Sequence, residues 1–304
     1  MIPIVSKLVS SYGPSGGIRT HGILLPKQAR YQLRYTRICL AESRRNYYTV
    51  DLGKMQEKSF TRAASSAIIG WKNCKVRINP MRMRKKRNLD PRMEACSAYW
   101  IQDPETHRGA WRALMPEAKE LRVEVGCGKG KFTVETAAAE PDVLLIAVER
   151  VKEAMVVAME KAKAMELKNV FFIDMDAAAI NDIFADDEID LLYINFCDPW
   201  PRSKNAKRRL TYRSFLDKYR RALKLGGEIH FKTDNEKLFA FSLEEFAACD
   251  LEIRNETWNL HEHGPVGIMT GYEEKFYALG TPIHRCECIV RSKPAPQETE
   301  EAET

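Results

Sequence analysis

Residues 121–132 read Leu-Arg-Val-Glu-Val-Gly-Cys-Gly-Lys-Gly-Lys-Phe, and this stretch decides the fold of the chain. Its first five residues alternate between apolar and charged side chains, which predicts a β-strand. Three glycines then predict a sharp turn, because glycine adopts backbone conformations that other residues avoid and lets a ligand approach closely. Lys131 to Ala139 follow as a predicted helix. A strand, a glycine turn and a helix in this order open a βαβ unit.

The same alternation continues along the chain. Short apolar or β-branched runs predict further strands at 144–148, 170–173, 189–194 and 228–232, with helices at 151–165, 212–223 and 236–248. Strands that alternate with helices imply a mostly parallel sheet with helices on both faces. Residues 251–257 and 283–290 are strand-like with no helix expected between them, which predicts an antiparallel pair at one edge. The predicted fold class is therefore α/β and Rossmann-like.

Acidic residues stand at the ends of successive predicted strands, where ligands of such sheets bind. The glycine turn reads GxGxG, which differs from the dinucleotide fingerprint GxGxxG and is the form usual in S-adenosylmethionine binding. Glu149 ends the second strand, where a carboxylate can accept hydrogen bonds from ribose hydroxyls. Asp176 follows the third strand and can take the adenine amino group. A simple turn and surface acids are the ordinary interpretations of each feature, but their order favours an S-adenosylmethionine site.

The fourth predicted strand runs into Asn195-Phe-Cys-Asp-Pro-Trp-Pro-Arg-Ser-Lys-Asn-Ala-Lys-Arg-Arg-Leu210. Here the sequence resembles the tRNA (guanine-N7)-methyltransferase family, in which Asn-Phe-Pro-Asp-Pro-Trp-Pro precedes a basic stretch. The resemblance covers roughly 81–292 and includes the runs at 231–234 and 270–276. Cys197 replaces the usual proline, which is expected to loosen the loop slightly. Arg202 stands where lysine is common, and the two cations differ in geometry.

The resemblance implies a class I methyltransferase, and we further expect it to act in the cytoplasm and without a protein partner. It implies methyl transfer from S-adenosylmethionine to N7 of guanine 46 in the variable loop of tRNA. The family's cofactor-binding positions fall on Glu124, Gly126, Gly128, Glu149, Asp176 and Asp198, and Asp198 is also the implied catalytic residue. The guanine-contacting positions fall on Arg202, Asp234, Thr270, Gly271, Tyr272 and Glu273. The RNA-contacting positions fall on Lys204, Lys207, Arg208 and Arg209.

The implied target explains which groups the site needs. Guanine N7 has a free lone pair and no proton, so its attack on a methyl group needs no general base to create the nucleophile. The site must align the reacting atoms and stabilise positive charge that develops on the purine. Asp198 and Asp234 are suited to accept hydrogen bonds from the guanine N1–H and amino group. Trp200 can stack on a base or pack the loop, and packing is the favoured interpretation.

Two other classes of protein remain open on the sequence. An N6-adenine methyltransferase would carry an Asp-Pro-Pro-Tyr-like loop, whereas this chain has Asp-Pro-Trp-Pro followed at once by basic residues. A non-catalytic RNA-binding subunit could keep the fold, although the acids at the four carried-over cofactor positions argue against it. The basic run 204–209 is either a solvated charged surface or a phosphate contact, and its place beside a predicted catalytic strand end favours phosphate.

Composition excludes several further classes. No apolar run approaches the roughly 20 residues of a membrane helix, so no membrane association is expected. The eight cysteines include no CxxC pair, which predicts neither a zinc ribbon nor a disulfide framework and favours a reducing compartment. No metal is expected: His261-Glu-His263 is predicted to be a surface loop without a third ligand. Cys286 and Cys288 are expected to face opposite sides of a strand.

The first 80 residues differ from the rest in charge and pattern. They hold 14 Lys/Arg against 3 Asp/Glu, while the remaining residues hold 34 against 39. Because residues 1–80 also lack sustained periodicity, we expect a misplaced start codon, with the true start at Met81 or Met83. A transit peptide or an accessory arm are the alternatives. The predicted organisation is an atypical extension at 1–80, a methyltransferase domain at 81–292 and a disordered acidic tail at 293–304.

Overall fold

The structure is a computed structural model, and it describes residues 88–294. The strands described there form one sheet in the order β3-β2-β1-β4-β5-β7-β6. Their bounds are Glu120–Val125 (β1), Val143–Val148 (β2), Val170–Ile173 (β3), Ile189–Asn195 (β4), Leu223–Thr233 (β5), Leu251–Thr257 (β6) and His284–Val290 (β7). Strands β1 to β5 pair in parallel, whereas β7 pairs antiparallel with both β5 and β6. The predicted mostly parallel sheet with an antiparallel edge is confirmed.

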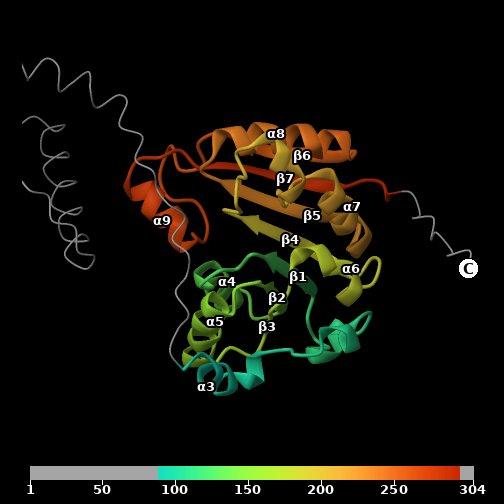
Figure 1. The fold of residues 1–304 in the computed structure, drawn as a ribbon, viewed down its shortest axis with the longest axis vertical. Coiled ribbons are helices and arrows are strands. Elements are labelled where there is room, and N and C mark those ends of the chain that lie inside the picture. Colours follow the sequence, from blue (N-terminus) through green and yellow to red (C-terminus); the bar gives the residue numbers. More distant parts are fainter. Residues whose placement is uncertain (1–87, 295–304) are drawn as a thin grey trace, which may run out of the picture. The chain divides into compact units, whose positions relative to one another are not determined.

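Helices cover both faces of the sheet, as Figure 1 shows. The α-helices are Leu89–Glu94 (α3), Lys131–Ala139 (α4), Lys152–Ala164 (α5), Ile180–Ile183 (α6), Arg213–Ala222 (α7), Glu236–Ala248 (α8) and Gly271–Ala278 (α9). Short 3-10 turns are Ser97–Tyr99 (η3), Pro104–His107 (η4), Trp111–Leu114 (η5), Ala177–Ala179 (η6) and Ser203–Arg208 (η7). Helices α3, α4 and α5 lie on one face and α6, α7 and α8 on the other.

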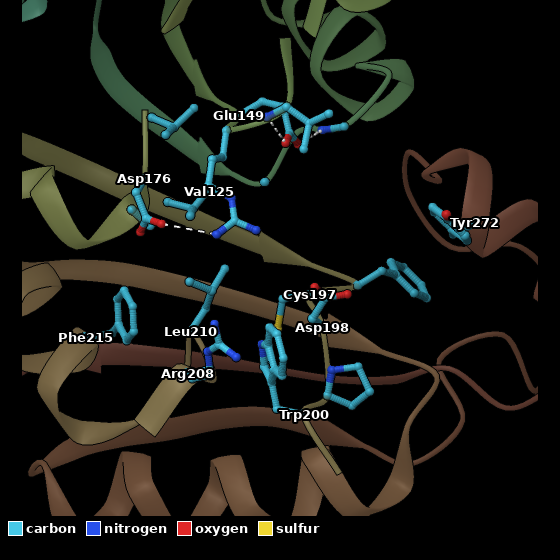
Figure 2. A pocket seen from close by; sticks show the side chains of 18 of the residues that line it. Val125, Glu149, Asp176, Cys197, Asp198, Trp200, Arg208, Leu210, Phe215 and Tyr272 are labelled. Atoms are coloured by element: carbon cyan, nitrogen blue, oxygen red, sulfur yellow. Dashed lines mark hydrogen bonds and ion pairs between the residues drawn. The ribbon is translucent and has the colours of Figure 1, made fainter. Parts of the chain in front are cut away.

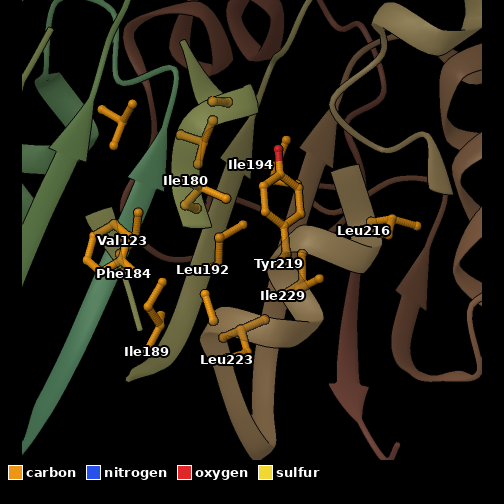
Figure 3. Close-up of a cluster of buried hydrophobic side chains, with 14 of the residues drawn as sticks. Val123, Ile180, Phe184, Ile189, Leu192, Ile194, Leu216, Tyr219, Leu223 and Ile229 are labelled. Carbon is orange, nitrogen blue, oxygen red and sulfur yellow. The ribbon is translucent and has the colours of Figure 1, made fainter. Parts of the chain in front are cut away.

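The core divides into two clusters because neighbouring strand residues point to opposite faces. In β2, Leu144 and Ile146 belong to the cluster under α6, α7 and α8, while Leu145 and Ala147 belong to the cluster under α4 and α5. Figure 3 shows part of the first cluster, in which Leu216 and Tyr219 of α7 pack over the sheet. Every residue of β2 is buried, as expected for a parallel strand covered on both sides.

Two sequence-based expectations about the end of the chain are wrong. Helix α9 lies between β6 and β7, where we expected no helix. Its start was visible in the sequence, because Thr270 and Glu273 form a capping box. Cys286 and Cys288 do not face opposite sides: their sulfurs lie 4.0 Å apart in the buried core. Residues two apart in a strand share a face, so the expectation misapplied the strand period.

Parts of the predicted organisation cannot be compared with the structure. The predictions for residues 1–80 and for the tail from residue 295 onward lie outside the described residues. Within 88–294, no helix is long and apolar enough to cross a membrane. The elements that the sequence located in this range all belong to one sheet and its covering helices.

Candidate active site

The carboxyl ends of the parallel strands open on a cavity of about 780 Å³. This is the edge at which open α/β sheets bind ligands, and Figure 2 shows the side chains around it. The cavity brings together residues from five strand ends and from α9. Among the predicted site residues, those that line it are Gly126, Gly128, Glu149, Asp176, Asp198, Lys207, Arg208, Asp234 and Tyr272.

The three glycines of the turn have different structural roles. All have positive φ angles, +80° at Gly126, +57° at Gly128 and +66° at Gly130, which residues other than glycine rarely adopt. A Cβ on Gly126 or Gly128 would meet nothing within 4 Å, so these two leave an open backbone cradle. A Cβ on Gly130 would lie 2.3 Å from the Cβ of Ala158. Gly130 therefore permits the close packing of the turn on α5.

Glu149 fixes the shape of this turn. Its Oε2 accepts a hydrogen bond from the Gly128 N–H at 2.8 Å, and its Oε1 accepts one from the Val151 N–H at 2.8 Å. The carboxylate thus joins the end of β2 to the glycine turn while it lines the cavity. A carboxylate held in this way is preorganised to accept further hydrogen bonds from a ligand.

Glu124 lies behind the glycine turn and does not line the cavity. Its carboxylate accepts hydrogen bonds from the Thr133 hydroxyl and, at 3.1 Å, from the side-chain nitrogen of Asn195. Complete burial raises the pKa of Glu124, and these two hydrogen bonds oppose the shift. Glu124 therefore connects β1 with α4 and β4 through these two hydrogen bonds.

Three aspartates approach the cavity from separate strand ends. Asp176 follows β3 and caps η6 by accepting a hydrogen bond from the Ala178 N–H at 3.0 Å. Asp198 follows β4 and is exposed, whereas Asp234 follows β5 and is half-buried. Burial raises the pKa of Asp234. The two acids expected to face guanine therefore share one cavity but differ in solvation.

The basic stretch does not behave as one unit. Lys207 and Arg208 line the cavity, and the Arg208 guanidinium lies 4.3 Å from the ring centroid of Trp200. Lys204 is exposed outside the cavity lining, as is Arg202. Arg209 is only partly exposed and bonds to backbone carbonyls of its own loop. The sequence predicted the same RNA-contacting role for Lys204, Lys207, Arg208 and Arg209, but their surroundings differ.

Helix α9 is held by a buried ionic cluster. The Glu273 side chain is fully buried; it accepts hydrogen bonds from the Thr270 N–H and from Lys232 Nζ at 3.2 Å, and lies 3.0 Å from His261 Nε2. His261 is therefore a core residue, and its expected place in a surface loop is wrong. Thr270, Gly271 and Glu273 do not line the cavity. They position α9, whose Tyr272 does.

Two aromatic side chains that line the cavity, Phe196 and Phe276, were not predicted as site residues, whereas Tyr272 was. The Phe196 and Phe276 rings are nearly parallel, with centroids 6.4 Å apart, and Tyr272 stacks against Phe276 with centroids 6.5 Å apart. All three line the cavity. The i, i+4 spacing of Tyr272 and Phe276 on α9 was the available signal. Cys197 also lines the cavity, and burial raises the pKa of its thiol to about 12, so it stays neutral.

A second polar cluster lies away from the cavity on β5 and β7. The ligand atoms of Glu228, His230 and Glu287 lie within 4.8 Å of one another, which is a spacing that a metal ion can use. Each of these groups already has a partner, because His230 bonds to Glu228 at 2.7 Å and Arg285 pairs with Glu287. Each ligand group of this cluster is therefore already engaged by another side chain of the protein.

The sheet order, the glycine turn and the carboxylates at successive strand ends define a Rossmann-like methyltransferase. A family model described as "Putative methyltransferase" matches residues 118–286. The tRNA (guanine-N(7)-)-methyltransferase of Bacillus velezensis is 41% identical over 214 residues, which cover 70% of this chain and 99% of the relative. The enzyme of the same name from Bacillus subtilis is 41% identical over 208 residues, 68% of this chain and 98% of the relative. The chain belongs to this family of tRNA (guanine-N(7)-)-methyltransferases.

Proposed function

We propose that the chain transfers the methyl group of S-adenosylmethionine to N7 of guanine 46 in the variable loop of tRNA. The observation that carries this proposal is the shared cavity. The glycine turn, Glu149 and Asp176 lie around it together with Asp198, Asp234 and three stacked aromatic rings. A volume of about 780 Å³ is within the range of about 300–1,000 Å³ typical of small-molecule and cofactor sites.

The residues present fit the cofactor. Gly126 and Gly128 leave a cradle that a Cβ would occupy, so a ligand can approach the backbone there. Glu149 would hold the ribose hydroxyls and Asp176 the adenine amino group. Glu124 would act through Thr133 and Asn195, because its own carboxylate is buried behind the turn. When bound, S-adenosylmethionine supplies a methyl group on a positively charged sulfur.

The other residues of the cavity suit a purine that becomes cationic. Asp198 and Asp234 would accept hydrogen bonds from the guanine N1–H and amino group, and these bonds strengthen as positive charge develops on the base. The rings of Phe196, Tyr272 and Phe276 offer faces for a base that has left its stack, and aromatic faces also attract cations. Cys197 supplies no base, since its thiol is neutral, and attack by N7 requires none.

The tRNA itself would be held by the basic residues that remain exposed. Lys204, Lys207 and Arg208 project from η7 beside the cavity, where they can neutralise phosphates near the target nucleotide. We infer action in the cytoplasm without a protein partner. The six cysteines among the described residues are free, which fits a reducing compartment.

The test is to identify the methylated nucleotide in an unmodified tRNA transcript treated with the purified chain and S-adenosylmethionine. Reduction and aniline cleavage at 7-methylguanine should cut the transcript at guanine 46, and a matched transcript with adenine at that position should not be cut. Asp198→Ala should lower turnover at least about 100-fold, the loss typical of a removed charge-stabilising contact.

Each other result has a defined meaning. Cleavage at a different guanine would retain the reaction and refute the position. Methylation of an adenine amino group would identify the rival enzyme class. Binding of both ligands without transfer would identify a non-catalytic RNA-binding subunit. A requirement for a cell extract would refute action without a partner.

A further inference from the structure

Arg209 ends the basic stretch expected to contact RNA, but its guanidinium contacts the loop at residues 196–201, which follows β4, carries Asp198 and is called here the catalytic loop. Nε donates a hydrogen bond to the Pro199 carbonyl at 3.1 Å, and Nη2 donates one to the Trp200 carbonyl at 3.1 Å. The guanidinium also lies over the ring of Phe241 in α8, 4.2 Å from its centroid. Three contacts thus engage the planar group from the loop and from a neighbouring helix.

The loop that Arg209 contacts needs such support. Phe196 has a φ angle of +53° and Trp200 one of +40°, so left-handed backbone occurs on both sides of Asp198. This conformation costs roughly 1–2 kcal/mol for a residue with a side chain and persists where surrounding contacts hold it. The loop also lies beyond the end of β4, where strand pairing no longer fixes its carbonyls. Arg209 supplies hydrogen bonds to two of them.

The neighbouring cations differ from Arg209 in this respect. Lys204, Lys207 and Arg208 are exposed, and Arg209 is partly buried. A side chain that contacts phosphate needs a charge that faces solvent. A side chain that holds a loop by two carbonyls needs several N–H donors at fixed angles, the planar donor fork of a guanidinium. Arginine presents that fork and lysine does not.

We propose that Arg209 is a positioning residue that acts through the Pro199 and Trp200 carbonyls to hold Asp198 in place, and that it is not a phosphate contact. The proposal rests on the proposed role of Asp198. It divides the basic stretch into exposed cations that contact RNA and one arginine that shapes the catalytic loop.

Arg209→Lys tests this division because it keeps the charge and removes the fork. We expect the single-turnover rate at saturating tRNA to fall about 10- to 100-fold, since small misplacements of catalytic groups have effects of this size. The dissociation constant for tRNA and its salt dependence should stay unchanged. Lys204→Gln is the matched control, and its effect should fall on the dissociation constant and on the salt slope, by about 1.

Phe241→Leu provides a second variant that leaves every cation in place. It removes the ring on which the guanidinium lies, and the rate should fall by less than in Arg209→Lys, again without a change in tRNA affinity. Melting temperature and S-adenosylmethionine affinity, measured for each variant, separate a displaced loop from a failure to fold.

The proposal is overturned if Arg209→Lys keeps the normal rate while Arg209→Gln weakens tRNA binding and flattens the salt slope. Normal behaviour of both variants overturns it as well. Failure of the proposed function is a separate result, because the methylated atom is identified with the unaltered chain. The rates of the variants are then compared on whichever methylation that chain performs.

Discussion

Asp198 and Asp234 show how two aspartates in one cavity come to differ at the scale of single residues. Asp198 is exposed, whereas Asp234 is half-buried at the end of β5. Burial disfavours the charged form of a carboxyl group and so raises the pKa of Asp234. The group therefore takes up a proton at a higher pH than an ordinary aspartate. A protonated carboxyl group is a poorer acceptor for the guanine amino group, so this shift should be visible in the reaction.

We predict that kcat/KM for tRNA falls with decreasing pH through the raised pKa of Asp234. Asp234→Asn should lower kcat/KM roughly 10- to 100-fold at neutral pH, since a hydrogen bond to a charged group contributes about 1.5–3 kcal/mol. It should also remove the acidic limb from the pH profile. The pH profiles of Asp234→Asn and of the unaltered chain are measured together. If the acidic limb persists in Asp234→Asn, another group causes it.

Helix α9 illustrates the scale of the element. Its eight residues gain little from helix propensity alone, and the buried cluster of Glu273, Lys232 and His261 holds its first turn in place. Burial lowers the pKa of Lys232, and the charge of Glu273 opposes that shift. The position of Tyr272 over the cavity therefore depends on an ion pair buried beneath it.

Adjacent glutamates on α9 allow a matched comparison. Glu273→Ala leaves buried Lys232 and His261 without their partner, and we predict a loss of about 3–5 kcal/mol in the free energy of unfolding. Glu274 forms an exposed ion pair with Lys131 at 3.1 Å, so Glu274→Ala should cost no more than about 1 kcal/mol. Urea unfolding of both variants measures the difference. Equal losses would show that the buried cluster does not stabilise the domain.

The short turn η7 carries the exposed lysines of the basic stretch. We predict that Lys204→Gln combined with Lys207→Gln weakens tRNA binding and reduces the slope of log affinity against log salt by roughly 2, one unit for each phosphate contact. Titration of tRNA binding at several salt concentrations provides the slope. An unchanged slope would make η7 a solvated surface without RNA contact.

At the scale of the whole molecule, the cavity-lining residues found within 88–294 lie between Val125 and Phe276. We predict that a chain shortened to residues 81–304 melts within about 4 °C of the full chain, which corresponds to about 1 kcal/mol. Its single-turnover rate should also match. Because residues 1–80 carry 14 Lys/Arg against 3 Asp/Glu, their removal should weaken nonspecific, salt-sensitive RNA binding.

Thermal unfolding and methylation of both chains test this prediction. Loss of stability or of turnover in the shortened chain would show that the first 80 residues contribute to the folded domain. N-terminal sequencing of the native protein then distinguishes the remaining cases. A start at Met81 or Met83 supports a misplaced start codon, and a start at a residue other than methionine supports cleavage of a transit peptide.

The sequence by itself determined which segments form strands and helices in the alternating part of the chain, the position of the glycine turn and the acids that follow the strands. These features are local: apolar periodicity reports which face of an element is buried, and a glycine or an acid after a strand needs no distant partner. The residue range of α4 could be predicted in full, and the antiparallel edge followed from two strand-like runs near the end of the chain.

Only the tertiary structure decided what surrounds the charged residues. Glu273 and Glu274 are neighbours in the sequence, yet one is fully buried and the other exposed. Arg208 and Arg209 are also neighbours in the sequence, yet the exposed Arg208 lies over the Trp200 ring, whereas Arg209 donates hydrogen bonds to the Pro199 and Trp200 carbonyls. Charged side chains carry no periodic signal of burial, and their partners can lie far away along the chain: Lys232 and Glu273 are 41 residues apart and Arg112 and Asp190 are 78 apart. Their roles therefore depend on contacts that form only when the sheet brings distant segments together.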